Sequence, residues 1–179
     1  MAAVFLLELA KGAVGNDPAL LSLGALPDSG QIHNEYWRLL TCGFLHYDFR
    51  HLLLNTLLLL LLGLIVERRV GTSWLLSLFL VASVASGAGI LAKHQLWPSS
   101  GVSLGASGGM FGLLGSALVL SFRQPLPSPF IRIAPLVVLA LGITYSFLPG
   151  VSMIGHVIGL IIGAAITLVV RLPGPAPEV

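Results

Sequence analysis

Hydrophobic residues along this chain fall into six runs, separated by short breaks that carry charge, proline or glycine. A helix rises about 1.5 Å per residue, so about 20 apolar residues cross a bilayer. We therefore predict an all-α polytopic membrane protein with six transmembrane helices, the first of them short. One of the breaks is the charged sequence Glu67-Arg68-Arg69. The runs cover residues 2–14, 51–66, 73–92, 104–122, 131–148 and 151–170.

The segment from residue 15 to residue 50 is the longest stretch that carries polar residues. It exceeds the length of a bare connector, and its aromatic residues suit a membrane interface. We expect a structured loop there, lying partly among the lipid headgroups. The end of the chain, LPGPAPEV, is rich in proline. We divide the chain into a membrane domain, residues 1–172, and a loose C-terminal tail, residues 173–179.

The composition excludes several classes of function. Only 9% of the residues are charged, against about a quarter in soluble domains. The formal charge of +2 forms no basic patch with interleaved aromatics, so we expect no nucleic-acid partner. The single cysteine cannot form an internal disulfide. The chain has no pair of intramembrane aspartates, which disfavours an aspartyl intramembrane protease. It has no H-E-x-x-H sequence, which disfavours a zinc protease. We expect no metal and no cofactor.

Basic residues favour one orientation slightly. With six crossings both termini share a side, which would hold five arginines against four basic residues on the other side. Because positive charge is retained inside, we expect cytoplasmic termini. We expect a multi-pass protein of a prokaryotic cell (inner) membrane.

Polar side chains inside the apolar runs are few, and they fall at three places. His51 and Asn55 open the second run and share a helix face, Ser107 opens the fourth, and His156 lies near the start of the sixth. Alternate helices of a bundle start from the same side of the membrane. These four side chains can therefore converge at one depth, where polar groups are costly and are candidates for function.

Ser107 is a candidate nucleophile. About sixteen residues separate it from Arg123, which corresponds to about 24 Å of helix, less than the hydrocarbon core of about 30 Å. Residues 101–105 must then descend to it in non-helical form, lining a wet cavity or buried in protein. A helix N-terminus there offers N–H groups to an oxyanion, and His156 can accept the serine proton.

A purely structural interpretation is also open, because Ser107 lies among small residues that can pack helix against helix. The same contact would bring Ser107 to His156, so the two interpretations are compatible. No Asp or Glu occurs between Glu67 and Glu178, which favours a Ser–His dyad over a triad. A transporter would need a polar path across the whole bilayer, whereas the polar side chains gather near one face. The glycines concerned are Gly108, Gly112, Gly115, Gly155, Gly159 and Gly163.

Three separated motifs resemble those of the rhomboid intramembrane serine proteases. They are WRLLTCGFLHYDFRHLLLNTLLLLLLGLIVERRVG from Trp37, GASGGMFGLLG from Gly105, and GHVIGLIIGAA from Gly155. The resemblance implies a six-helix bundle and a serine endopeptidase that cleaves transmembrane segments of membrane proteins. It makes Ser107, between Gly105 and Gly108, the nucleophile and His156 the general base.

The resemblance also implies supporting roles. It assigns His51 and Asn55 to the oxyanion hole, together with the backbone N–H of Ser107. Two residues of the first loop, Trp37 and Arg38, match a structural pair of the family, and His46 matches a bracing histidine.

Two further positions matter in this resemblance. Glu67 matches an acid that we take as structural. Phe111 stands where some members carry a tyrosine packed on the catalytic histidine, and its ring can stack but cannot hydrogen-bond.

An alternative is a catalytically inactive rhomboid-like protein that binds other membrane proteins. Such members usually lack the serine or the histidine, and this chain has both. In either case the expected partners are transmembrane proteins and the lipid bilayer. The sequence leaves the oligomeric state and the physiological substrate open.

Overall fold

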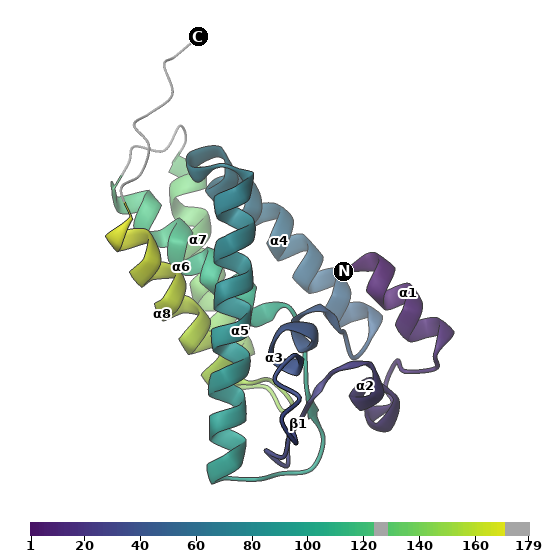
Figure 1. Cartoon of the computed structure of the whole chain (residues 1–179). Coiled ribbons are helices and arrows are strands. Elements are labelled where there is room, and N and C mark those ends of the chain that lie inside the picture. Colours follow the sequence, from purple (N-terminus) through teal and green to yellow (C-terminus); the bar gives the residue numbers. More distant parts are fainter. Residues whose placement is uncertain (124–128, 171–179) are drawn as a thin grey trace.

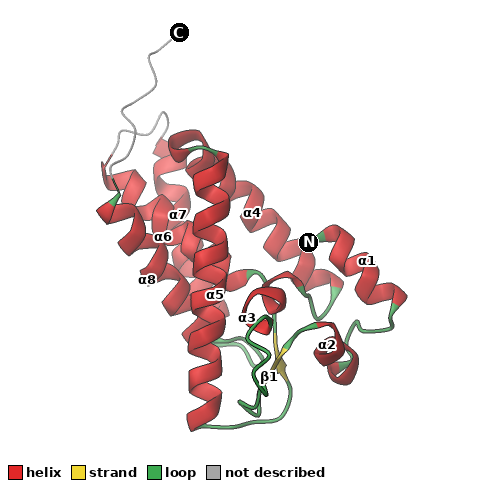
Figure 2. Ribbon diagram, viewed as in Figure 1, coloured by secondary structure: helices red, strands yellow, loops and turns green. Residues whose placement is uncertain are grey.

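The computed structural model describes residues 1–123 and 129–170, so the predicted loose tail, residues 173–179, lies outside the described residues. Within them the chain is mainly helical (Figures 1 and 2). The bundle consists of α4 (Phe49–Val70), α5 (Thr72–Leu96), α6 (Ser107–Arg123), α7 (Pro129–Tyr145) and α8 (Met153–Val169). The N-terminal elements are α1 (Ala2–Ala10), α2 (Asp17–Leu23), α3 (Arg38–Thr41) and the 3₁₀ helix η1 (Cys42–Phe44). They lie beside one half of the bundle (Figure 1).

Two of the described helices, α4 and α5, are long and apolar enough to cross a membrane, judged by length and composition. Residues 132–145 and α8 form shorter apolar helices. Helix α1 has nine residues, about 13 Å of helix, in line with its short apolar run.

The charged sequence Glu67-Arg68-Arg69, which separates two apolar runs, lies within α4, because the helix continues to Val70. Arg68 and Arg69 lie in the last turn, where positive charge interacts favourably with the helix dipole. Gly71, with φ of 82°, ends the helix instead. The Glu67 side chain accepts a hydrogen bond of 2.6 Å from the Thr72 hydroxyl, at the start of α5.

Helix α6 contacts each of the other four bundle helices and is the most buried of them. Its closest neighbour is α8, and glycines make the approach possible. A Cβ atom on Gly159 would overlap the carbonyl oxygen of Gly108, and one on Gly163 would overlap that of Gly112. The predicted glycine contact between these two segments is confirmed.

The loop from residue 15 to residue 50 is structured, as predicted. Arg38 holds it together: its Nη1 donates to the carbonyl oxygens of Leu21 (2.6 Å) and Ala25 (2.9 Å). Its Nε donates to Glu35 at 2.8 Å, and its guanidinium lies 4.7 Å from the centre of the Trp37 ring. One arginine therefore joins three separate turns of the loop.

Helix α1 is attached to this loop by a buried hydrogen bond between Glu8 and His46. The Glu8 carboxylate is fully buried and accepts a hydrogen bond of 3.1 Å from the backbone N–H of His46. Burial raises the pKa of Glu8 and lowers the pKa of His46 to about 4. Glu8, which interrupts the first apolar run, therefore attaches that helix to the segment before α4.

The structure differs from the all-α prediction in one short antiparallel sheet, in which β1 (Leu26–Pro27) pairs with β2 (Val102–Ser103). Two residues are too few to give the alternating pattern by which strands are predicted. Asp28 strengthens the junction, because its Oδ1 accepts from the Ser103 hydroxyl at 2.6 Å and lies 3.2 Å from His94 Nε2. The N-terminal loop is thereby joined to the segment that leads into α6.

Candidate active site

Ser107 is the first residue of α6, and the segment before it is non-helical, as predicted. The chain turns into the helix at Gly105, whose φ of 119° suits only glycine. A Cβ atom there would also lie 2.6 Å from Cε1 of the His51 ring. The Gly105 N–H donates to the carbonyl oxygen of Cys42 at 2.9 Å. These constraints fix the direction in which α6 starts, and so the position of Ser107.

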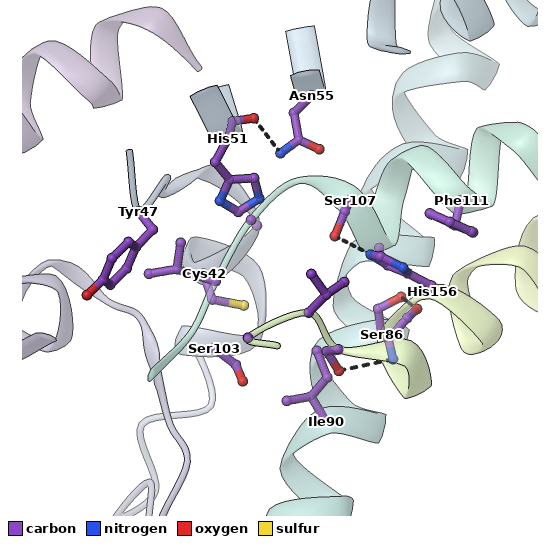
Figure 3. Close-up of a pocket in the computed structure, with 18 of the residues that line it drawn as sticks. Cys42, Tyr47, His51, Asn55, Ser86, Ile90, Ser103, Ser107, Phe111 and His156 are labelled. Carbon is purple, nitrogen blue, oxygen red and sulfur yellow. Dashed lines mark hydrogen bonds between the residues drawn. The ribbon is translucent and has the colours of Figure 1, made fainter. Parts of the chain in front are cut away.

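His156 lies in the first turns of α8 and faces Ser107 (Figure 3). Its Nε2 is 2.9 Å from Ser107 Oγ, a hydrogen-bond distance, and the histidine is 3% exposed. Ser152 caps α8, accepting from the Gly155 N–H at 3.4 Å. The structure therefore brings together the two residues predicted as nucleophile and base, through the close approach of α6 and α8.

The Phe111 ring stacks on the His156 ring, with centroids 4.1 Å apart and planes 7° from parallel. Phe111 lies one helical turn after Ser107 on α6, and both side chains face His156. The predicted stacking is present, and it limits the tilt of the imidazole.

A second serine, Ser146, contacts the other nitrogen of the same histidine. Its Oγ lies 2.6 Å from His156 Nδ1 and 2.7 Å from the carbonyl oxygen of Gly142. The sequence analysis did not identify this residue. The available signal was weak: a serine at the end of an apolar run, ten residues before the histidine.

His51 and Asn55 lie in the first two turns of α4, where the Asp48 side chain caps the helix by accepting from the His51 N–H at 2.8 Å. Asn55 Nδ2 donates to the His51 carbonyl at 3.1 Å. An amide nitrogen has two hydrogens, so this bond leaves one donor. Both side chains line the same cavity as Ser107 and His156 (Figure 3).

This cavity has a volume of about 1120 Å³ and reaches from Ser107 and His156 to the N-terminal loop. Cys42 lines it, but burial raises the pKa of that thiol to about 12, so it stays protonated and is a poor nucleophile. Within residues 1–123 and 129–170, no group of three or more His, Cys, Asp or Glu could hold a metal ion.

Three of the predicted supporting residues, Trp37, Arg38 and His46, do not line the cavity. Trp37 and Arg38 act within the N-terminal loop. His46 is fully buried, and its ring meets the His51 ring edge-on with centroids 5.2 Å apart. It therefore supports a residue of the cavity from outside.

Comparison with known proteins identifies the family of the chain. A family model for the rhomboid domain matches residues 33–173. The chain is 33% identical over 174 residues to "Rhomboid protease GluP" of Bacillus subtilis (strain 168), covering 94% of this chain and 32% of that protein. It is 37% identical over 133 residues to "RHOMBOID-like protein 4" of Arabidopsis thaliana, covering 73% and 33%.

A third relative is "Rhomboid protease GlpG" of Yersinia pestis (strain Pestoides F), 33% identical over 169 residues, covering 90% of this chain and 56% of that protein. The chain thus spans between a third and just over half of the lengths of these relatives. Two of these relatives, from Bacillus subtilis and Yersinia pestis, are named as rhomboid proteases. Because the family model covers well over half of the 179 residues, the chain belongs to the rhomboid family of integral membrane proteins.

Proposed function

We propose that this chain is an active intramembrane serine endopeptidase that cleaves transmembrane segments of other membrane proteins through a Ser107–His156 dyad. The observation that carries the proposal is the 2.9 Å distance between Ser107 Oγ and His156 Nε2. The relatives named as rhomboid proteases support the same class of reaction.

In the proposed reaction, His156 Nε2 accepts the proton of Ser107 as its Oγ attacks the scissile carbonyl carbon. The tetrahedral intermediate collapses to an acyl-enzyme, and the imidazolium returns the proton to the leaving amine. His156 then takes a proton from a water molecule, which attacks the ester carbonyl. The released serine regains its proton from the histidine.

Three donors are available for the oxyanion. The first N–H groups of a helix have no partner within the helix, so the Ser107 N–H at the start of α6 is one of them. We assign the other two to the ring of His51 and the remaining N–H of Asn55. Donors that are fixed before the reaction stabilise the developing charge, because they need no reorganisation.

We propose a membrane domain of residues 1–172 in which α4 to α8 cross the bilayer. The six-helix arrangement stays a prediction for the first helix, since α1 has nine residues. The basic last turn of α4 and Arg123 at the end of α6 would face the cytoplasm under the positive-inside rule. Cytoplasmic termini follow from the same rule, and we propose a prokaryotic inner membrane as the location.

The alternative is a catalytically inactive rhomboid-like protein that binds membrane proteins. The hydrogen-bond distance within the dyad favours the enzyme, because a binding protein has no need of a paired serine and histidine. Both functions share the same partners, transmembrane proteins in a bilayer.

The test compares the wild type with Ser107→Ala and His156→Ala in liposomes containing a model transmembrane substrate. Each variant is first shown to unfold at the wild-type temperature. We expect cleavage by the wild type and losses of at least about a thousandfold in both variants. Equal cleavage by all three would indicate a contaminating protease, and no cleavage of several substrates would favour the binding protein.

A further inference from the structure

We infer that Ser146 is a positioning residue for His156, selecting the tautomer and the ring orientation that present Nε2 to Ser107. The inference rests on the proposed function, in which His156 is the general base. It assigns a role to a third helix, because Ser146 follows directly after α7, whereas Ser107 and His156 belong to α6 and α8.

The two serines contact opposite nitrogens of one imidazole. Ser107 Oγ lies 2.9 Å from Nε2, and Ser146 Oγ lies 2.6 Å from Nδ1. Ser146 is 6% exposed and, unlike Ser107 and His156, does not line the cavity. Water in the cavity is therefore poorly placed to replace its hydroxyl.

The contacts run from His156 through Ser146 to the carbonyl oxygen of Gly142, and that carbonyl shows where the hydrogens lie. Ser146 Oγ is 2.7 Å from the carbonyl oxygen of Gly142, and a carbonyl oxygen can only accept. The Ser146 hydroxyl therefore donates to Gly142 and offers a lone pair to His156. Nδ1 then carries the hydrogen, so in the neutral ring Nε2 carries none and can accept the proton of Ser107.

Phe111 alone cannot provide this selection. The stacked ring, 4.1 Å away and nearly parallel, fixes the plane of the imidazole. A rotation of 180° about the Cβ–Cγ bond would keep that plane but would turn a carbon atom toward Ser107. The bond from Nδ1 to Ser146 distinguishes the two orientations, because only a nitrogen can donate it.

A neutral hydroxyl also suits the surroundings. No Asp or Glu occurs between Glu67 and Glu178, so no carboxylate from this part of the chain can orient the histidine. A buried carboxylate would be costly to desolvate in a membrane. The neutral hydroxyl of Ser146 stabilises the charge of the imidazolium less than a carboxylate would, but it avoids that desolvation cost.

Gly142 connects the contact between Ser146 and His156 with the stacking of Phe111 on His156. A Cβ atom on Gly142 would lie 2.7 Å from Cζ of Phe111, so the absence of a side chain lets the ring approach α7. The carbonyl of the same residue receives the Ser146 hydroxyl. The orientation of His156 therefore depends on where α7 lies against α6.

The experiment uses Ser146→Ala, which removes the acceptor, and Ser146→Thr, which keeps a hydroxyl. Ser121→Ala is the matched control: it is also a buried serine whose hydroxyl donates to the carbonyl four residues before it, Ala117, at 2.7 Å. For each protein, kcat and KM are measured on a transmembrane substrate in liposomes. The tautomer of His156 is read by ¹⁵N NMR of histidine-labelled protein, with His156→Ala identifying its signals.

We expect Ser146→Ala to lower kcat about tenfold, the value of one lost hydrogen bond, with KM within about twofold of the wild type. Ser146→Thr recovers most of the rate, and Ser121→Ala keeps all of it. In the spectrum, the wild type shows hydrogen on Nδ1, and Ser146→Ala shows a mixture of tautomers. An unchanged kcat with an unchanged tautomer in Ser146→Ala would overturn the inference, as would hydrogen on Nε2 in the wild type.

Failure of the proposed function gives a different pattern. If the wild type shows no cleavage that depends on Ser107, the protease proposal fails, and the NMR spectrum still decides the role of Ser146. Equal losses in Ser146→Ala, Ser146→Thr and Ser121→Ala would reveal a general loss of packing and would also overturn the inference.

Discussion

Ser86 on α5 donates a hydrogen bond of 2.8 Å to the carbonyl oxygen of Gly155, the residue that precedes His156. The bond is buried and joins two residues that are 69 positions apart in the chain. A Cβ atom on Gly108 would lie 2.5 Å from the Cβ atom of Ser86, so the same serine also packs beside the start of α6. Ser86 therefore contacts both helices of the proposed dyad.

Replacement of Ser86 by alanine removes this bond and leaves the methylene group in place. We expect the free energy of unfolding to fall by about 1 kcal/mol, measured by thermal unfolding in detergent. Ser83→Ala, one turn earlier on α5, is the control, because Ser83 Oγ has no hydrogen-bond partner among the described residues. A similar loss in both variants would mean that the bond to Gly155 adds nothing.

The contact between α6 and α8 has no room for a methyl group at Gly163. A Cβ atom there would overlap the carbonyl oxygen of Gly112, which is backbone and cannot rotate away. We expect Gly163→Ala to cost about 1–3 kcal/mol of stability. Cleavage should fall further, because the helices that carry Ser107 and His156 must separate. Unfolding and cleavage are measured on the same preparation.

Gly63→Ala provides the matched control for this change. The nearest atom to its Cβ would be Leu75 Cδ1 at 3.6 Å, an ordinary contact. Alanine also favours the helix by about 1 kcal/mol over glycine. Gly63→Ala should therefore be at least as stable as the wild type and cleave at the same rate. Wild-type cleavage by Gly163→Ala would contradict the tight contact.

His46 makes stability depend on pH. Burial and the nearby His51 lower its pKa from 6.5 to about 4 in the folded state. Between these values the unfolded chain binds a proton that the folded chain does not, so stability falls as the pH is lowered from 6.5 to 4. The slope from this residue is at most about 1.4 kcal/mol per pH unit. Denaturant unfolding at a series of pH values measures it.

The variant His46→Phe keeps a buried ring without a titrating group, and its stability should vary less over this window. Burial raises the pKa of Glu8, which gives a slope of the opposite sign, so the difference between variant and wild type isolates His46. The control is His33→Asn, at an exposed residue with φ of 44°, a conformation that asparagine tolerates. Parallel curves for His46→Phe and the wild type would refute the assignment.

The two residues of the proposed dyad could be predicted because each is an isolated polar residue in an apolar run. Ser107 and His156 are polar positions in long apolar runs, and the glycines beside them indicated which helices touch. His51 and Asn55 were found by the same reasoning, and the structure brings all four side chains to one cavity. The family followed from the order and spacing of three motifs.

Other contacts join residues from separate segments, and no pattern in the local sequence predicts them. Ser146 stands where an apolar run ends, so it has the sequence appearance of a loop residue. Asp28 and His94 lie in separate polar segments, and only the folded chain brings them within 3.2 Å. The end of the apolar run at Val66 does not mark the end of α4, because a charged triplet can end a membrane crossing without ending the helix.

The bond between Asp28 and Ser103 joins residues that are 75 positions apart, beside the pairing of β1 with β2. Ser107 lies four residues beyond this junction, so its approach is complete only when the first loop has docked. During synthesis of the proposed enzyme, α4 and α5 must therefore be made, and the chain must pair with its own N-terminal loop, before Ser107 reaches its position. A partly folded chain of the proposed enzyme would carry Ser107 and His156 without the arrangement needed to cleave neighbouring membrane proteins.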